Sequence, residues 1–133
     1  MRLIHLCAWQ SHLWNRAVAS YVRELTTRTT LVWVESLEGR LAFPRGALAV
    51  DPAMKNRFRI PGPRLEDVTH AKQRELLGKA LELEGLEPGQ FSIEGVSGFQ
   101  LKGEERELVV EVRALEVGQI GRASCRERVY VLV

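Results

Sequence analysis

The sequence predicts an α+β domain in which two main helices pack on a small mixed or antiparallel sheet. Two long segments carry apolar residues at helical spacing, one at the start of the chain and one near its middle. Several short segments rich in β-branched residues lie between prolines and glycines, as strands do. A chain of 133 residues is long enough to bury a core. The order helix, strands, helix, strand is typical of the mixed class.

The first helix is predicted from Leu3 to Leu25, a segment without Pro or Gly. Residues 26–30 end it, because four threonines in five positions disfavour helix. The predicted buried stripe consists of Leu3, Leu6, Cys7, Leu13 or Trp14, Ala17, Tyr21 and Leu25.

Short strands are predicted next. Residues 31–34 form one strand, Glu38-Gly39 offers a turn, and residues 40–43 form a possible return strand. Residues 57–60 alternate as a strand does and stop at the rigid turn of residues 61–63, Pro-Gly-Pro.

A second helix is predicted from Asp67 to Glu84, capped by Asp67 or Thr69 and closed by Gly85. Its predicted buried stripe is Val68, Ala71, Leu76, Leu77, Ala80, Leu81 and Leu83. A turn or short helix carrying Phe91 and Ile93 follows, and then a strand over residues 107–112 that continues to Val117.

The composition is that of an ordinary soluble protein, with 45% apolar and 27% charged residues. No apolar run approaches the roughly 20 residues of a membrane helix. Polar residues interrupt any signal-peptide core near the N-terminus, so a cytoplasmic location is expected. Cys7 and Cys125 are too few for a disulfide framework, and Cys7 is expected to be buried. His5, His12 and His70 have no metal-ligand spacing.

Residues 120–129 resemble one reading frame of a common sequencing adapter. We therefore expect residues 120–133 to be an artificial tail and residues 1–119 to be the authentic part. Without the tail the chain has 16 basic and 16 acidic residues in place of 19 and 17, so its formal charge of +2 comes from the tail. The arginines of the tail are accordingly not interpreted as a nucleic-acid-binding arm.

Four segments carry a resemblance to a known family, in the family's order. Residues 8–15 contain Trp-Gln-Ser-x-x-Trp-Asn after a small residue, and residues 61–63 are Pro-Gly-Pro. Residues 83–86, Leu-Glu-Gly-Leu, are followed by Phe91, and residues 106–108 are Arg-Glu-Leu. Together they resemble the TruD/Pus-seven family of tRNA pseudouridine synthases.

The resemblance implies an isomerase that converts uridine in tRNA, at uridine 13, to pseudouridine without a metal or cofactor. The family's nucleophilic aspartate belongs to a motif that this sequence does not contain, so no catalytic residue is predicted here. Residues 1–119 would be a partial TRUD-type inserted domain with the first strand that returns to the catalytic domain. The piece would embrace tRNA, would be inactive alone, and would have the missing catalytic-domain segments as its intramolecular partner. Asp51 and Asp67 are interpreted as turn and cap residues.

Four basic residues are the best candidates for RNA contact: Lys55, Arg57, Arg59 and Arg64. Arg57 and Arg59 share one face of a strand, and Arg64 follows the rigid turn, so the group could grip phosphates. The alternative is an ordinary solvated strand face.

Gln10 and Asn15 are two amides on an otherwise apolar helix and must find partners. Either they tie the helix to a neighbouring loop or they contact RNA. Trp9 and Trp14 are expected in the core rather than as base-stacking platforms. A stand-alone, non-catalytic RNA- or protein-binding module is the main rival function. A small hydrolase is weaker, because no nucleophile–base pair is evident.

Overall fold

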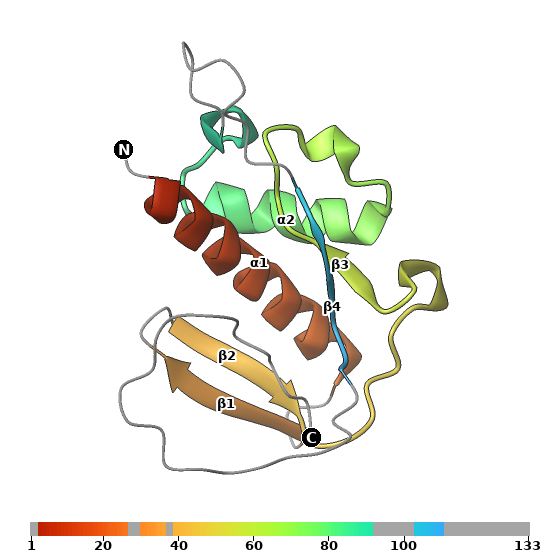
Figure 1. Cartoon of the computed structure of the whole chain (residues 1–133). Helices are drawn as coiled ribbons and strands as arrows, with labels where there is room; N and C mark the ends of the chain where they lie inside the picture. The colour runs from red at the N-terminus through yellow and green to blue at the C-terminus, as the bar shows by residue number, and fades with distance from the viewer. Residues whose placement is uncertain (1–2, 27–29, 37–38, 92–102, 111–133) are drawn as a thin grey trace.

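The structure is a computed structural model that describes residues 3–26, 30–36, 39–91 and 103–110. Its helices are α1, Leu3–Leu25, and α2, Ala71–Leu83. The strands β1, Leu31–Ser36, and β2, Gly39–Pro44, form one antiparallel pair. The strands β3, Arg57–Arg59, and β4, Glu105–Glu107, form the other (Figure 1). The predicted α+β class is confirmed, with the sheet divided into two antiparallel pairs.

Three short 3-10 helices connect these elements: η2 at Pro52–Met54, η3 at Leu65–Asp67 and η4 at Pro88–Phe91. The predictions for Ile93, for the strand beyond Val110 and for the tail of residues 120–133 lie outside the described residues.

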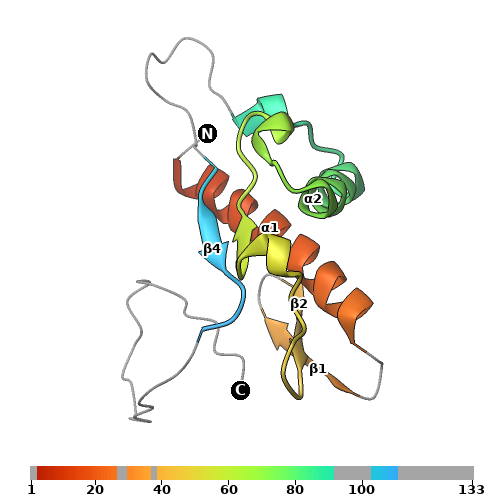
Figure 2. The same ribbon diagram turned by 90° about the vertical axis from the view of Figure 1, so that its right-hand side faces the viewer.

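Helix α1 is the centre of the fold. It lies between the β1–β2 hairpin and α2, and contacts both (Figures 1 and 2). Its predicted span, Leu3–Leu25, is confirmed. The long, uninterrupted apolar stripe lets the helix pack against two neighbours at once. Of the predicted stripe, Leu6, Leu13, Trp14, Ala17 and Tyr21 are buried, and Val22, which was not predicted, is buried with them. Leu25 was predicted to be buried but is 40% exposed at the end of the helix.

Two predictions for the first turns of α1 were wrong. Cys7 is exposed and Trp9 is 38% exposed, although both were expected in the interior. Among residues 5–10 only Leu6 and Gln10 are buried, so the described chain covers a single narrow side of the helix there. The ring of Trp9 instead lies edge-on to His12, 5.5 Å between centroids.

Phe58 is the centre of the main core and is completely buried. The rings of Trp14 and Tyr21 lie 6.4 and 6.2 Å from it, one edge-on and one tilted. Side chains from α1, η2, α2, η4 and the end of β4 complete the cluster, among them Met54, Val68, Leu77, Phe91 and Leu108. The short strand β3 is therefore held by the interior of the protein rather than by a wide sheet.

The second helix begins at Ala71, four residues later than predicted, and neither Asp67 nor Thr69 caps it. Asp67 belongs to η3, and the N-cap position is His70, whose side chain makes no cap bond. Val68 is extended and 1% exposed. The extended backbone at Val68 places its side chain in the core. Burial of this side chain is worth more than the hydrogen bonds of a helix that began at Asp67.

The end of α2 follows the prediction, since Gly85 has a φ of +63°. The amide of Gly85 donates to Glu82 and that of Leu86 donates to Leu81, which closes the helix as a left-handed glycine does. Ala71 and Leu83 of the predicted stripe are exposed.

Strand β4 occupies Glu105–Glu107, two residues earlier than the predicted start. The ladder ends because Asn56, the partner residue before β3, has a φ of +58° and turns the backbone away. The Asn56 side-chain amide donates to the Val109 carbonyl and accepts from the Val109 N–H. Residues 108–110 are thus held by a side chain instead of a continuing strand.

Glu84 joins the end of α2 to α1. Its Oε1 accepts from His12 Nε2 at 3.1 Å and from Arg16 Nη1. The hydrogen bond with His12, together with the positive charge of Arg16, lowers the pKa of Glu84 from the usual 4.5, although partial burial opposes the shift. A carboxylate with a lowered pKa stabilises the folded state above its unfolded-state pKa.

We therefore expect the free energy of unfolding to fall as the pH drops from about 5 through the lowered pKa of Glu84. Urea unfolding of the parent and of Glu84→Gln at pH 7 and at pH 3 checks this. The variant should lose stability at pH 7 and show a smaller change between the two pH values. Glu82→Gln, at an exposed glutamate, is the matched control. An unchanged pH dependence in Glu84→Gln would contradict the assignment.

Candidate nucleic-acid interface

An open pocket of about 500 Å³ lies beside β3, between η2 and the start of α2. Three of the four predicted basic residues, Lys55, Arg57 and Arg59, line it. Arg64 lies outside this lining, with its side chain 75% exposed and 3.3 Å from the carboxylate of Asp67. We refer to this pocket as the β3 pocket.

The alternation of β3 places its arginines on the face opposite Phe58, with Arg57 exposed and Arg59 half-buried. Phe58 is completely buried, so Arg57 and Arg59, its neighbours on the strand, must point to the opposite face. The Trp14 indole donates to the Phe58 carbonyl at 3.0 Å and fixes the strand on α1. The basic face is therefore positioned by the core.

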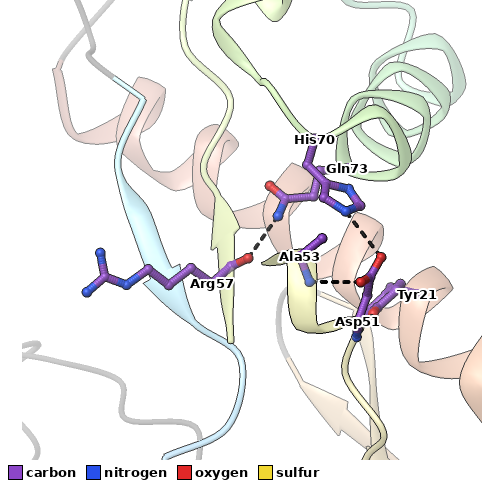
Figure 3. Close-up of polar contacts among 6 residues, drawn as sticks. All are labelled: Tyr21, Asp51, Ala53, Arg57, His70 and Gln73. Carbon is purple, nitrogen blue, oxygen red and sulfur yellow. Dashed lines mark hydrogen bonds and ion pairs between the residues drawn. The ribbon is translucent and has the colours of Figure 1, made fainter. Parts of the chain in front are cut away.

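Gln73 supports β3 from α2, and no sequence argument had singled it out. Its Oε1 accepts from the Arg59 N–H at 3.1 Å, and its Nε2 donates to the Arg57 carbonyl at 2.8 Å. Figure 3 shows the bond between Gln73 and the Arg57 carbonyl. The amide thus pairs the free edge of β3 as a further strand would. The only sequence signal was one amide at helical spacing from the buried Leu76 and Leu77.

Lys55 and Asn56 turn the chain from η2 into β3 with two successive left-handed residues, at φ +49° and +58°. Such values are uncommon for residues other than glycine, and asparagine tolerates them best. The Lys55 N–H donates to the Pro52 carbonyl, and the Asn56 side chain holds Val109. The tight turn fixes the point from which Lys55 and Arg57 leave the backbone.

Asp51 and His70 form a pair next to the β3 pocket (Figure 3), and of the two only His70 belongs to the pocket lining. Asp51 accepts from the Ala53 N–H at 2.9 Å and caps η2, as expected of a turn residue, and its Oδ2 lies 3.3 Å from His70 Nε2. The Asp51 N–H donates to the Tyr21 hydroxyl. Nδ1 of His70 is buried and has no partner among the described residues. With one ring nitrogen on Asp51 and the other enclosed, the imidazole joins η2 to α2.

The pocket carries an excess of positive charge. Arg57 lies 3.4 Å from the carboxylate of Glu105, and both side chains are about half exposed. Lys55 and Arg59 have no ion-pair partner among the described residues. The lining thus has three cations and one exposed carboxylate, and this excess favours an anionic ligand. The exposed Arg57–Glu105 pair contributes only about 0–1 kcal/mol, so a phosphate can compete with Glu105 for Arg57.

The two predicted amides are both buried. Gln10 is 6% exposed, and its Nε2 donates to the Pro61 carbonyl at 2.7 Å. This is the geometry of a tie between the helix and the Pro-Gly-Pro turn. Asn15 is 9% exposed and lies at the base of a second groove, described below.

No cluster of three His, Cys, Asp or Glu side chains suited to a metal occurs within the described ranges. In those same ranges no helix has both the length and the apolar character needed to cross a bilayer. No family model, curated protein or solved structure matches this chain.

Proposed function

We propose that this chain is part of a tRNA pseudouridine synthase of the TruD/Pus-seven kind and supplies a region that embraces tRNA. The observation that carries the proposal is the bond between Gln10 and the Pro61 carbonyl. These residues belong to two of the family-like segments and are 51 positions apart in the chain. If both segments belong to one architecture, a contact between them is expected, and this bond supplies it.

The other family-like segments join the same network. The guanidinium of Arg106 lies 5.8 Å from the ring centre of Trp14, and Arg106 pairs with Phe58 across the β3–β4 ladder. Glu84 bonds His12 and Arg16 of the first helix.

The proposed role of the chain is to hold RNA while another segment does the chemistry. Lys55, Arg57 and Arg59 of the β3 pocket would bind phosphates. Asp51 is occupied as a cap, and Asp67 pairs with Arg64, so the nucleophile for uridine 13 would come from the catalytic segments of the parent enzyme. The reaction needs no metal or cofactor, and the proposed compartment is the cytoplasm.

A second candidate is a stand-alone RNA- or protein-binding module without catalysis. The observation that favours it is the continuous core around Phe58, which receives side chains from both helices and from the region of β4. Such a core is expected of a unit that folds by itself.

Reading the gene on both sides of codons 1–119 separates the two candidates. The synthase proposal predicts an open frame that continues upstream into an aspartate-bearing motif, and downstream DNA that differs from the codons of residues 120–133. A stop codon directly before Met1, together with a genomic origin of the tail, would overturn it and favour the module.

A further inference from the structure

A second groove of about 300 Å³ runs between α1, α2 and the β1–β2 hairpin, and it shares no lining residue with the β3 pocket. We call it the hairpin groove. Its lining carries four permanent cations and no carboxylate. The cations are Arg16, Arg23, Arg40 and Lys79.

The cations come from three elements and face a common space. Arg16 and Arg23 are seven residues apart on α1, which places them on one side of the helix about 10 Å apart. Ala19 and Ser20 lie between them and are small, so the groove stays open. Cations spread over α1, α2 and β2 match a ligand with several negative charges along its length better than a single small anion.

An aromatic ring lies at the same place. Trp33 of β1 lines the groove and is 37% exposed, and the guanidinium of Arg40 lies 5.1 Å from its ring centroid. Leu83 forms part of the lining and is 71% exposed. An exposed tryptophan among cations is the usual means of binding single-stranded nucleic acid, since stacking of one base contributes about 1–3 kcal/mol.

Arg16 is held by Glu84, whose side chain is only 18% exposed, so this cation is engaged in joining α2 to α1. The other three cations of the groove are accessible. Arg40 pairs with Glu35 at 2.7 Å, with both side chains more than 60% exposed. Lys79 pairs with Glu75 and is 59% exposed, and Arg23 has no partner among the described residues. Exposed pairs of this kind contribute about 0–1 kcal/mol, so phosphates can replace the carboxylates.

We propose that the hairpin groove binds a single-stranded segment of RNA, with phosphates on Arg23 and Lys79 and one base stacked on Trp33. The choice of RNA as the polyanion rests on the proposed function, whereas the charge and the exposed ring are properties of the groove itself. The groove would give the protein a second contact with tRNA, away from β3, on an unpaired stretch where bases are free to stack.

The test measures binding of a fluorescein-labelled 12-nucleotide oligouridine by fluorescence anisotropy over a range of salt. All proteins are the full chain with Arg122, Arg126 and Arg128 changed to Gln, which removes the arginines of the tail. The groove variant is Arg23→Ala/Lys79→Ala, and its charge-matched control is Arg45→Ala/Lys72→Ala, at cations outside both sites. Thermal unfolding establishes that each protein is folded.

The groove variant is expected to bind at least tenfold more weakly. The slope of log affinity against log salt concentration should become shallower by about 0.7 for each lost phosphate contact. Trp33→Ala should weaken binding about tenfold and Trp33→Phe, which keeps a ring, much less. Equal losses in the groove variant and its control, or no binding by the parent, would overturn the proposal. Loss in Arg57→Ala/Arg59→Ala with unchanged groove variants would also overturn it, while leaving the proposed function standing. The reverse pattern would support the groove and contradict the role of β3.

Discussion

Replacing Gln73 with leucine is expected to lower the free energy of unfolding by about 2 kcal/mol. The substitution keeps the volume of a side chain that is 6% exposed but removes both of its bonds to β3. The Arg59 N–H and the Arg57 carbonyl then lose their partners at a partly buried edge of β3. A buried backbone group without a hydrogen-bond partner costs about 1–3 kcal/mol. Urea unfolding followed by circular dichroism measures the change.

Gln90→Leu is the matched control for Gln73→Leu. Gln90 is exposed, and its Oε1 accepts from the Glu87 N–H within a turn. Water replaces that bond, so we expect a change below about 0.5 kcal/mol. If both variants lost the same stability, Gln73 would be an ordinary helix residue and β3 would be held by its other contacts alone.

The parts of the fold that follow from local pattern were predictable. Helix α1 has one long apolar stripe without a breaker, and the β1–β2 hairpin has two short β-rich segments on either side of a turn with glycine, so both were found close to the predicted bounds. Gly85 closes α2 because only a left-handed residue suits that position.

The parts that depend on tertiary contacts were not predictable. Asp67 and Thr69 look like helix caps, yet burial of Val68 keeps the link to α2 extended. Strand β4 ends where Asn56 turns away and holds Val109, which no local pattern reveals. The same limit explains the exposed Cys7, because a sequence does not say how much of a helix its neighbours cover.

The charged residues of the candidate site were predictable, but the contacts that position them were not. The alternation around Phe58 placed Arg57 and Arg59 on the face opposite Phe58, where Arg57 is exposed and Arg59 half-buried. It did not bring in Gln73 or separate Arg64 from the pocket. Interactions of side chains with distant backbone groups leave no periodic trace in a sequence.

The largest effect on function is expected from Arg57→Ala/Arg59→Ala. Removing two of the three cations of the β3 pocket should weaken binding of unmodified tRNA about tenfold. The slope of log affinity against log salt concentration should fall by the amount expected for about two lost phosphate contacts. Arg57→Lys/Arg59→Lys keeps both charges and should retain most of the affinity. Because the backbone bonds to Gln73 do not involve these side chains, the variants should stay folded.

To test directly whether β3 presents a tRNA-binding face, the dissociation constant for tRNA is measured for the full chain and for Arg57→Ala/Arg59→Ala over a range of salt concentrations. The Arg122, Arg126 and Arg128 side chains are changed to Gln in both proteins. We expect about tenfold weaker binding and a shallower salt dependence for the variant, and a smaller effect for Arg45→Ala/Lys72→Ala. Equal affinity of the parent and the β3 variant for tRNA would contradict a tRNA-binding role of β3.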